Sequence, residues 1–308
     1  MQNNKKPLVT VLVPAYNHED FVEQTIESIV NQTYGYINIE LIVIDDCSKD
    51  DTANILQVLS KKYKFALFKN ELNLGVVNNL NSLLRIAKGK YIASCASDDY
   101  WSANKLEEQV KAMESLSDDI VVCHTNAFII DTNNKFLFFH DSGKTFQGNI
   151  MPQILIDNAI VAPSALIRKE VFNYVGYYDQ KISFEDREMW IRIALKYNFF
   201  HIDKALVYRR QHKNNLSRDM TQWYQSYSAI FKSYYKYYKK YNLIEEYHYI
   251  MFTHLSASNF LLSFKHMLKS RHLFFRKASL RAIMKLFIPR MFFKSDISLK
   301  VKSYIKSW

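Results

Sequence analysis

The sequence predicts an α/β fold, with a mainly parallel sheet flanked by helices and a helical extension at the carboxyl end. Short, nearly continuous apolar runs alternate with amphipathic segments through most of the chain, as is typical of parallel strands covered on both faces. The remainder differs in charge: residues 221–308 hold 16 Lys and Arg against 3 Asp and Glu, whereas residues 1–220 hold 25 against 27. We therefore predict a first domain over 1–220 and a basic, aromatic-rich tail over 221–308.

The first elements follow from the order of apolar and polar residues. Residues 7–16 are predicted to form a strand with Pro14 near its end. The turn Asn17-His18-Glu19-Asp20 then begins an amphipathic helix. Residues 40–44 form a second, fully apolar strand, and a further helix starts at about Asp51.

Two of the predicted strands end in a pair of carboxylates. The second strand stops at Asp45-Asp46, and a later apolar run, residues 90–97, stops at Asp98-Asp99. The carboxyl edge of an open α/β sheet is where ligands bind, and paired carboxylates suit a hard divalent cation that also contacts substrate phosphates. The alternative for either pair is a solvated acidic turn, but coincidence poorly explains two pairs at one edge.

Composition narrows the function classes. The chain has 6 Gly and 5 Pro, and no glycine-rich phosphate loop follows the first strand, which argues against dinucleotide-binding and P-loop proteins. Its three cysteines are too scattered for a disulfide framework or a zinc site. It has no run of 18 uncharged apolar residues and no signal-peptide pattern, so a cytoplasmic protein is expected.

Seven motifs in order resemble those of the inverting glycosyltransferase family 2, over about residues 7–220. They are Val9 to Asn17, Ser28 to Tyr34, Glu40 to Thr52, Asn73 to Val76, Asp98-Asp99, Phe184-Glu185-Asp186 before Trp190, and Tyr208 to Ser217. The resemblance implies a Rossmann-like A-type nucleotide-sugar-binding fold. It also implies transfer of a sugar from a nucleoside-diphosphate sugar to a glycan or lipid-linked glycan acceptor.

The resemblance also implies roles on the donor side. Asp99 is the expected main ligand of Mn²⁺ or Mg²⁺, with Asp98 near the ribose or in the metal shell. Pro14 and Tyr16 are expected beside the nucleobase, and Asp46 is expected to accept a base N–H, which favours uridine or thymidine. The alternative for Tyr16 is a core aromatic. For neighbouring Asp45 we expect a role in the turn.

On the acceptor side, Asp186 is the expected general base of a single displacement. Glu185 is expected to orient the acceptor or a loop, and Trp190 to lie nearby. Helix capping is the structural alternative for these carboxylates. The predicted loop 208–217 has three alternative roles. Its cations, which include Arg210, bind the diphosphate, or His212 joins the metal shell, or the loop is a solvated basic loop. The spacing of the residues does not distinguish among these roles.

Two positions depart from the family pattern. Asn79-Leu80-Asn81 stands where many members have Ala-Arg-Asn, so a phosphate-binding charge has to come from elsewhere, such as residues 209–213. Cys47 stands where glycine is usual, which predicts a turn without a positive φ.

The tail carries no motif that we recognise. A helix over 273–287 would place apolar residues beside Lys277, Arg281 and Lys285, which fits either an anionic membrane surface or a cap on the catalytic domain. A membrane-bound form would lie on the inner face of the cell membrane.

From the motifs and the charge pattern together, we predict a metal-dependent glycosyltransferase of surface polysaccharide synthesis, such as capsule or lipopolysaccharide. A nucleotidyltransferase and a nucleic-acid-binding protein are the alternatives, and nucleic acid is not an expected partner.

Overall fold

The structure is a computed structural model that describes residues 6–143, 146–213, 215, 219–256 and 258–270. Backbone contacts divide the chain into two compact units, residues 1–215 and 216–308. The first unit is the α/β part, and the second is helical over its described residues. The predicted fold class is confirmed.

The amino-terminal half of the sheet is parallel. Its strands are β1 (Val9–Ala15), β2 (Ile39–Asp45), β3 (Ala66–Lys69) and β4 (Tyr91–Ser94). β1 lies between β2 and β4, and β3 pairs with β2. β1 and β2 are almost wholly buried, as their continuous apolar sequences require. The two Asp-Asp pairs therefore follow strands whose carboxyl ends meet at one edge.

The second half makes the sheet mixed. It adds β5 (Tyr100–Trp101), β6 (Ile120–Ile130), β7 (Phe136–His140), β8 (Leu166–Arg168) and β9 (Asn198–Arg210). The order in the described chain is β3-β2-β1-β4-β8-β6-β9-β5, with β7 on β6. β8 is antiparallel to both β4 and β6, whereas β6 and β9 are parallel.

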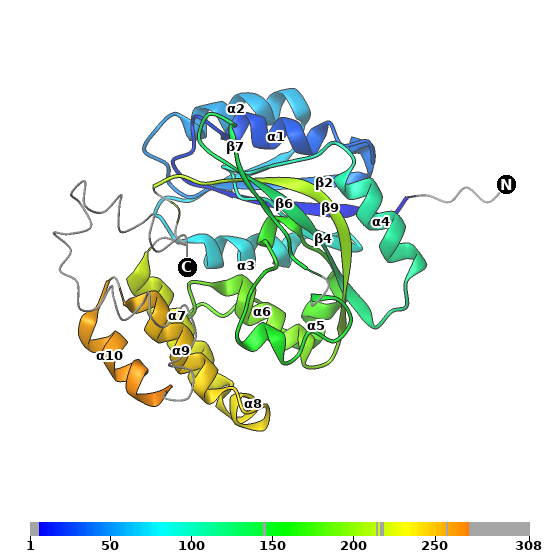
Figure 1. Ribbon diagram of the computed structural model, residues 1–308. Coiled ribbons are helices and arrows are strands. Elements are labelled where there is room, and N and C mark those ends of the chain that lie inside the picture. Colours follow the sequence, from blue (N-terminus) through cyan, green and yellow to red (C-terminus); the bar gives the residue numbers. More distant parts are fainter. Residues whose placement is uncertain (1–5, 144–145, 214, 216–218, 257, 271–308) are drawn as a thin grey trace. The chain divides into compact units, whose positions relative to one another are not determined.

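Helices cover both faces of this sheet. They are α1 (Val22–Val30), α2 (Thr52–Tyr63), α3 (Val76–Ile86), α4 (Lys105–Ser115), α5 (Phe172–Val175) and α6 (Glu185–Ala194). Short 3₁₀ turns lie at η1 (Tyr36–Asn38), η3 (Gln153–Leu155), η4 (Ala162–Ser164) and η5 (Lys169–Val171). α1 and α2 lie on one face and α3 on the other (Figure 1). The buried faces of α1 and α2 join the inward side chains of β1 and β2 in one core.

Two turns between elements place limits on the side chain that they can hold, one through a close backbone approach and one through a positive φ. Gly89 precedes β4 so closely beside β1 that an added Cβ would lie 2.5 Å from the Thr10 nitrogen. The expectation for Cys47 was wrong, because its φ is +64°. A side chain is tolerated there: the thiol lies 3.2 Å from the carbonyl oxygen of Glu71, as a donor, and 3.2 Å from Lys49 Nζ.

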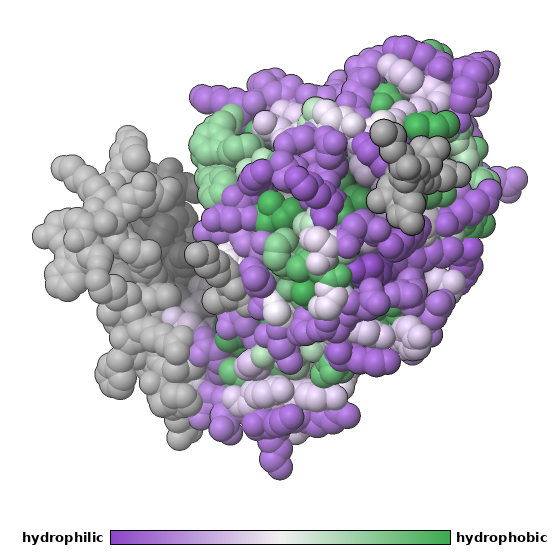
Figure 2. All heavy atoms as spheres, turned by 90° about the vertical axis from the view of Figure 1, so that its right-hand side faces the viewer, coloured by the Kyte–Doolittle hydropathy of each residue, from purple (hydrophilic) through white to green (hydrophobic). Residues whose placement is uncertain are grey.

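The second unit contains α7 (Met220–Ser233), α8 (Tyr235–Lys240), α9 (Ile244–Leu255) and α10 (Phe260–Lys269). Asp219 caps α7 by accepting from the amides of Thr221 and Gln222. The proposed helix over 273–287 lies outside the described residues. Among the helices of the described chain, none is both long and apolar enough to cross a membrane. The face shown in Figure 2 is mainly hydrophilic, with hydrophobic residues in small separate patches.

Candidate active site

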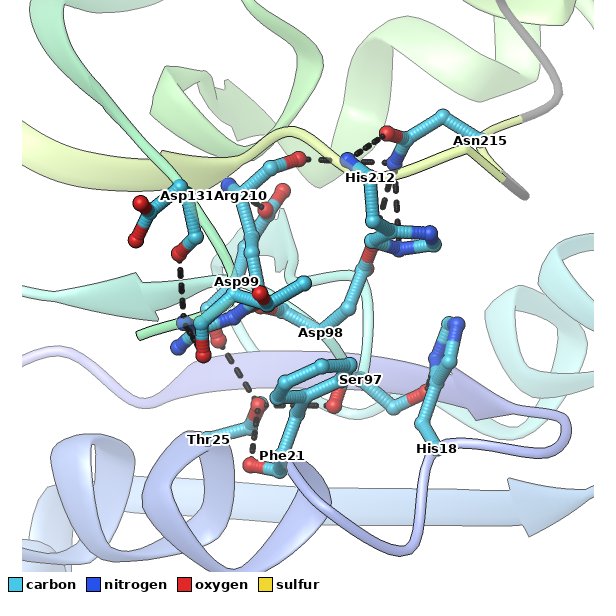
Figure 3. A network of polar contacts seen from close by, with 11 residues as sticks. His18, Phe21, Thr25, Ser97, Asp98, Asp99, Asp131, Arg210, His212 and Asn215 are labelled. Atoms are coloured by element: carbon cyan, nitrogen blue, oxygen red, sulfur yellow. Dashed lines mark hydrogen bonds and ion pairs between the residues drawn. The ribbon is translucent and has the colours of Figure 1, made fainter. Parts of the chain in front are cut away.

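The turn after β4 carries the second carboxylate pair, and α1 holds this turn in place. Cys95 donates its amide to the carbonyl of Leu12, which continues the β1–β4 pairing. The hydroxyl of Thr25 lies 2.9 Å from the carbonyl of Ser97 and 2.7 Å from that of Asp99. Both hydrogen bonds are buried, and Figure 3 shows Thr25 beside the turn. The pair is therefore fixed by the core.

Asp98 faces two histidines and an amide. Its Oδ2 lies 2.9 Å from His212 Nε2 and 3.3 Å from Asn215 Nδ2. His18, from the turn after β1, completes the group: one ligand atom each from His18, Asp98 and His212 lies within 4.8 Å of the others. Figure 3 shows these side chains converging from three parts of the chain. One carboxylate and two imidazoles form a donor set for a divalent metal.

The electrostatics keep Asp98 ionised. Burial acts to raise its pKa, but the hydrogen bond to His212 and the nearby His18 outweigh burial, so the pKa is lowered. Burial lowers the pKa of His18, with Asp98 opposing the shift. An anionic carboxylate beside a neutral imidazole is the protonation state that binds a cation.

Asp99, the expected main metal ligand, is bonded to the end of β9 through one of its two oxygens. Its side chain is buried, and its Oδ1 accepts the amide of Arg210 at 2.7 Å. Burial first, and then the charge of Asp98, raise its pKa well above the usual value. The side chain thus ties the turn to the end of β9, whereas Asp98 is the member of the pair that lies in the group with the two histidines.

Arg210 is also placed differently from the expected diphosphate grip. It ends β9 and is buried at 1% exposure, because β9 pairs with β6 through this residue. Its guanidinium donates to the carbonyls of Asp98 and Asp131 and to Gln24 Oε1. It also packs over the ring of Phe21, 4.5 Å from the centroid. With its donors committed, Arg210 braces the turn.

The first carboxylate pair supports the loop that opens α3. Asp46 Oδ1 accepts from Asn70 Nδ2 and the amide of Leu74, and its Oδ2 accepts from the amide of Gly75, all at 2.8 Å. Asp45 accepts the amide of Ser48 at 3.3 Å, which agrees with the turn role expected of it. Asp46, expected to accept a base N–H, thus has a structural task as well.

The two predicted residues around the end of β1 differ in exposure. Tyr16 is 39% exposed, directly after the strand. Its side chain is therefore not the core aromatic considered as the alternative. Pro14 is half-buried within β1, next to Ile44 of β2.

The acidic start of α6 forms a second cluster. Asp186 Oδ2 lies 3.3 Å from Asn158 Nδ2, and its Oδ1 accepts the amide of Arg187. Burial raises the pKa of Asp186. Burial and the charge of Asp186 raise the pKa of Glu185 to about 8. The charge of Arg209 acts on both Asp186 and Asp99, which brings this cluster within electrostatic range of the β4 turn.

Trp190 lies in the core rather than toward an acceptor. It is 2% exposed, and its ring packs edge-on against Phe199 of β9 at 6.2 Å. It follows Asp186 by four residues, one helical turn on, and this turn packs against β9. Its role is to hold α6 and the two carboxylates in place.

His18 and Asn215 were not singled out as site residues in the sequence analysis. His18 lies in a turn that sequence patterns describe only as a helix start, and its proximity to Asp98 arises from the pairing of β1 with β4. Asn215 belongs to the last of the seven motifs, but motif membership does not give its contact with Asp98.

Comparison with known proteins gives matches in sequence and in structure. The family described as glycosyl transferase family 2 matches residues 10–176. An uncharacterized glycosyltransferase of Methanocaldococcus jannaschii is 33% identical over 230 residues, 73% of this chain and 79% of that protein. A UDP-Glc:alpha-D-GlcNAc-diphosphoundecaprenol beta-1,3-glucosyltransferase of Escherichia coli is 38% identical over 122 residues, 40% of this chain and 47% of that protein.

The share of each relative that is matched varies. A glycosyltransferase of Rickettsia bellii is 33% identical over 198 residues, 64% of this chain, but the match spans 28% of that protein.

Among solved structures, a mannosyltransferase of Pyrobaculum calidifontis in complex with GDP-Man and Mn²⁺ superposes with a TM-score of 0.62. The superposition covers 92% of this chain and 85% of that one at 14% identity, so this likeness concerns the fold alone.

Proposed function

The chain belongs to glycosyltransferase family 2, and from this membership we propose that it transfers a sugar from a nucleoside-diphosphate sugar to a glycan hydroxyl with inversion. The observation that carries the proposal is the contact of Asp98 with His212, 2.9 Å apart, at the carboxyl edge of the parallel strands. Ligands of open α/β sheets bind at this edge. A second acidic cluster at Glu185 and Asp186 supplies the base that an inverting displacement needs.

The residues fit a divalent metal. Asp98 offers an anionic oxygen and His212 a nitrogen 2.9 Å from it, and the carboxylate is ionised for the reason given above. Mn²⁺ or Mg²⁺ held there would act as a Lewis acid that neutralises the charge on the departing diphosphate. The Mn²⁺ bound to the Pyrobaculum mannosyltransferase supports a metal in this fold.

The chain's own carboxylates divide the acceptor chemistry between them. Glu185, with its pKa raised to about 8, is protonated at neutral pH and can donate a hydrogen bond to the acceptor. Asp186 then carries the negative charge and takes the proton of the attacking hydroxyl. The raised pKa of Asp186 makes it a stronger base than an exposed aspartate.

The residues beside the expected nucleobase and the substrates of a relative support particular classes of donor and acceptor. We propose a uridine or thymidine diphosphate sugar, with Tyr16 beside the base and the remaining lone pair of Asp46 Oδ2 accepting the base N–H. The Escherichia coli relative uses UDP-Glc and a diphosphoundecaprenol-linked acceptor, which supports a uridine donor and a lipid-linked glycan acceptor. Synthesis of a surface polysaccharide, with the basic tail on the anionic inner leaflet, is the corresponding process.

The test is turnover of nucleotide sugars by the Asp98→Asn variant. We expect Mn²⁺ to raise the melting temperature of the wild type with its donor, and the variant to lose this rise. Its kcat should fall by roughly 10² or more, since several kcal/mol of charge stabilisation is removed. Asp118→Asn, at an exposed aspartate outside both groups of possible metal ligands among the described residues, is the matched control. Near-normal turnover by Asp98→Asn, or release of inorganic diphosphate as the product, would overturn the proposal.

A further inference from the structure

We propose that His18 is a third protein ligand of the metal, so that the site is a two-histidine, one-carboxylate centre that prefers Mn²⁺ and related transition ions to Mg²⁺. This inference rests on the proposed function, because it concerns the same metal. The sequence motifs direct attention to Asp98, Asp99 and the 208–217 segment. None of them assigns a role to a histidine in the turn after β1.

The geometry brings the three donors to one point. Ligand atoms on a single ion at about 2.0–2.2 Å lie within roughly 4.4 Å of one another. The described donors of His18, Asp98 and His212 are all within 4.8 Å of each other. The rings of His18 and His212 stand edge to face, with centroids 5.7 Å apart. Small side-chain rotations therefore suffice to bring all three atoms onto one cation.

A hydrogen bond orients the His18 ring for this role. Its Nδ1 lies 2.7 Å from the hydroxyl of Ser97, one residue before Asp98. Metal-binding imidazoles usually donate their second ring N–H to a neighbouring group, which fixes the tautomer. If Nδ1 donates to Ser97, the lone pair of Nε2 is available to a metal. Figure 3 shows the ring of His18 directed toward His212.

The main chain of His18 is held as firmly as its ring. Its amide donates to Thr52 Oγ1 at 2.8 Å, at the start of α2. The next residue, Glu19, donates its amide to Asp50 Oδ2 and accepts the amide of Asp51 at 2.7 Å. These three bonds clamp the turn after β1 onto the turn after β2. His18 is thus presented by a preorganised loop, as a ligand should be.

The donor set then decides which cation the site prefers. Mg²⁺ favours oxygen ligands and keeps several waters, whereas the affinity of nitrogen-containing sites for first-row transition ions rises from Mn²⁺ through Fe²⁺, Co²⁺ and Ni²⁺ to Cu²⁺. A second imidazole adds a nitrogen donor that Mg²⁺ does not favour, so it shifts the preference toward transition ions. An alternative role for His18 is packing, because its ring also lies 6.2 Å from that of Phe21. A packing role requires no nitrogen on the metal.

The experiment uses the full-length protein with Mn²⁺ alone, then with Mg²⁺ alone, by calorimetry and by electron paramagnetic resonance. For the wild type we expect tighter binding of Mn²⁺ than Mg²⁺, and two nitrogen couplings to Mn²⁺. His18→Gln should weaken Mn²⁺ binding about tenfold or more, leave one nitrogen coupling, and change Mg²⁺ binding much less. His254→Gln is the control, because His254 is exposed on α9 and lies outside both groups of possible metal ligands among the described residues.

The outcomes separate this inference from the proposed function. Two nitrogen couplings and unchanged Mn²⁺ affinity in His18→Gln would overturn the His18 assignment, even if Asp98→Asn abolishes turnover. Full turnover by Asp98→Asn would instead overturn the proposed function. If His18→Gln unfolds, Ser97→Ala replaces it: loss of the orienting hydrogen bond should weaken Mn²⁺ binding while the melting temperature stays close to that of the wild type. Unchanged Mn²⁺ affinity in Ser97→Ala would count against the assignment.

Discussion

Asp98 and Asp99 are adjacent and chemically identical, yet the fold gives them opposite surroundings. Asp98 meets two imidazoles, whereas Asp99 is turned into the core and bonded to the amide of Arg210. Both residues lie in the turn between β4 and β5, where Asp99 donates its amide to the carbonyl of Ala96. The sequence predicted that an acidic pair would mark the site. It did not show which member contacts the histidines and which contacts Arg210, because that depends on where β9 and the segment after it lie.

At the same scale, Glu185 and Asp186 are predicted to differ in function. Asp186→Asn should lower kcat by about 10²–10⁴ while donor binding by calorimetry stays close to that of the wild type, because the base acts only on the acceptor. Glu185→Gln mimics the protonated acid and should retain most activity at pH 7. A parallel loss of donor affinity and turnover in Asp186→Asn would show a structural or donor-binding role instead.

The Glu185 variant also has a stability signature. The pKa of Glu185 in the folded protein, about 8, lies above the 4.5 of an unperturbed glutamate. The folded state therefore binds the extra proton between these values, and stability falls as pH rises through this window. Glu185→Gln should reduce that fall between pH 5 and 8, measured by urea unfolding.

At the scale of elements, the sequence predicted what local periodicity controls. β1, α1, β2 and α2 appear where the apolar pattern placed them, within one or two residues in most cases and within about five for the start of α1. The expected loop over 208–217 was partly wrong, because Tyr208 to Arg210 belong to β9. Those residues pair with β6 and, at Tyr208, with β5. The local pattern of apolar residues does not predict such pairing between distant strands. It also does not predict that antiparallel β8 lies between β4 and β6.

Two helices of the second unit are predicted to separate in acid. His248 on α9 and His266 on α10 lie 2.8 Å apart through their Nδ1 atoms, and both are buried. Burial lowers each pKa from 6.5 to about 4, and for His266 the charges of His248, Lys269 and Lys265 add to it. The unfolded chain then binds more protons below pH 6.5, so stability should fall as pH drops from about 6.5 to 4.

Thermal unfolding followed through the aromatic near-ultraviolet signal would measure this effect. A loss of about 1 kcal/mol corresponds to a fall of 4–8 °C in the melting temperature of a unit of this size. The double variant His248→Gln with His266→Gln should reduce the acid dependence between pH 6.5 and 4, and the pKa of His124, which burial also lowers to about 4, accounts for part of what remains. His254→Gln, an exposed histidine on the same helix, should leave it unchanged. An acid dependence equal to that of the wild type in the double variant would contradict the explanation.

At the scale of the whole molecule, charge is distributed unevenly along the chain. The net charge of +11 arises beyond residue 220, where basic residues outnumber acidic ones by 13. Charge of one sign gathered in one segment attracts a surface of the opposite sign. No described helix spans a membrane. The tail is the segment whose charge would favour contact with an anionic lipid surface.

Charge reversal at Lys277, Arg281 and Lys285 tests this proposal. Each Lys or Arg near an anionic surface contributes roughly 1 kcal/mol, so the triple reversal to Glu should lower partitioning onto phosphatidylserine vesicles by about a hundredfold or more. Turnover of a water-soluble acceptor should persist. A matched variant reverses three exposed lysines of the first unit, Lys61, Lys64 and Lys88, and has the same net charge.

If both variants lose vesicle binding equally, overall charge explains the attraction. If only the tail variant loses it, and added salt weakens binding of the wild type, the tail is the membrane contact. A lower melting temperature of the tail variant with unchanged vesicle binding would instead favour the interpretation of these cations as part of a cap on the catalytic domain.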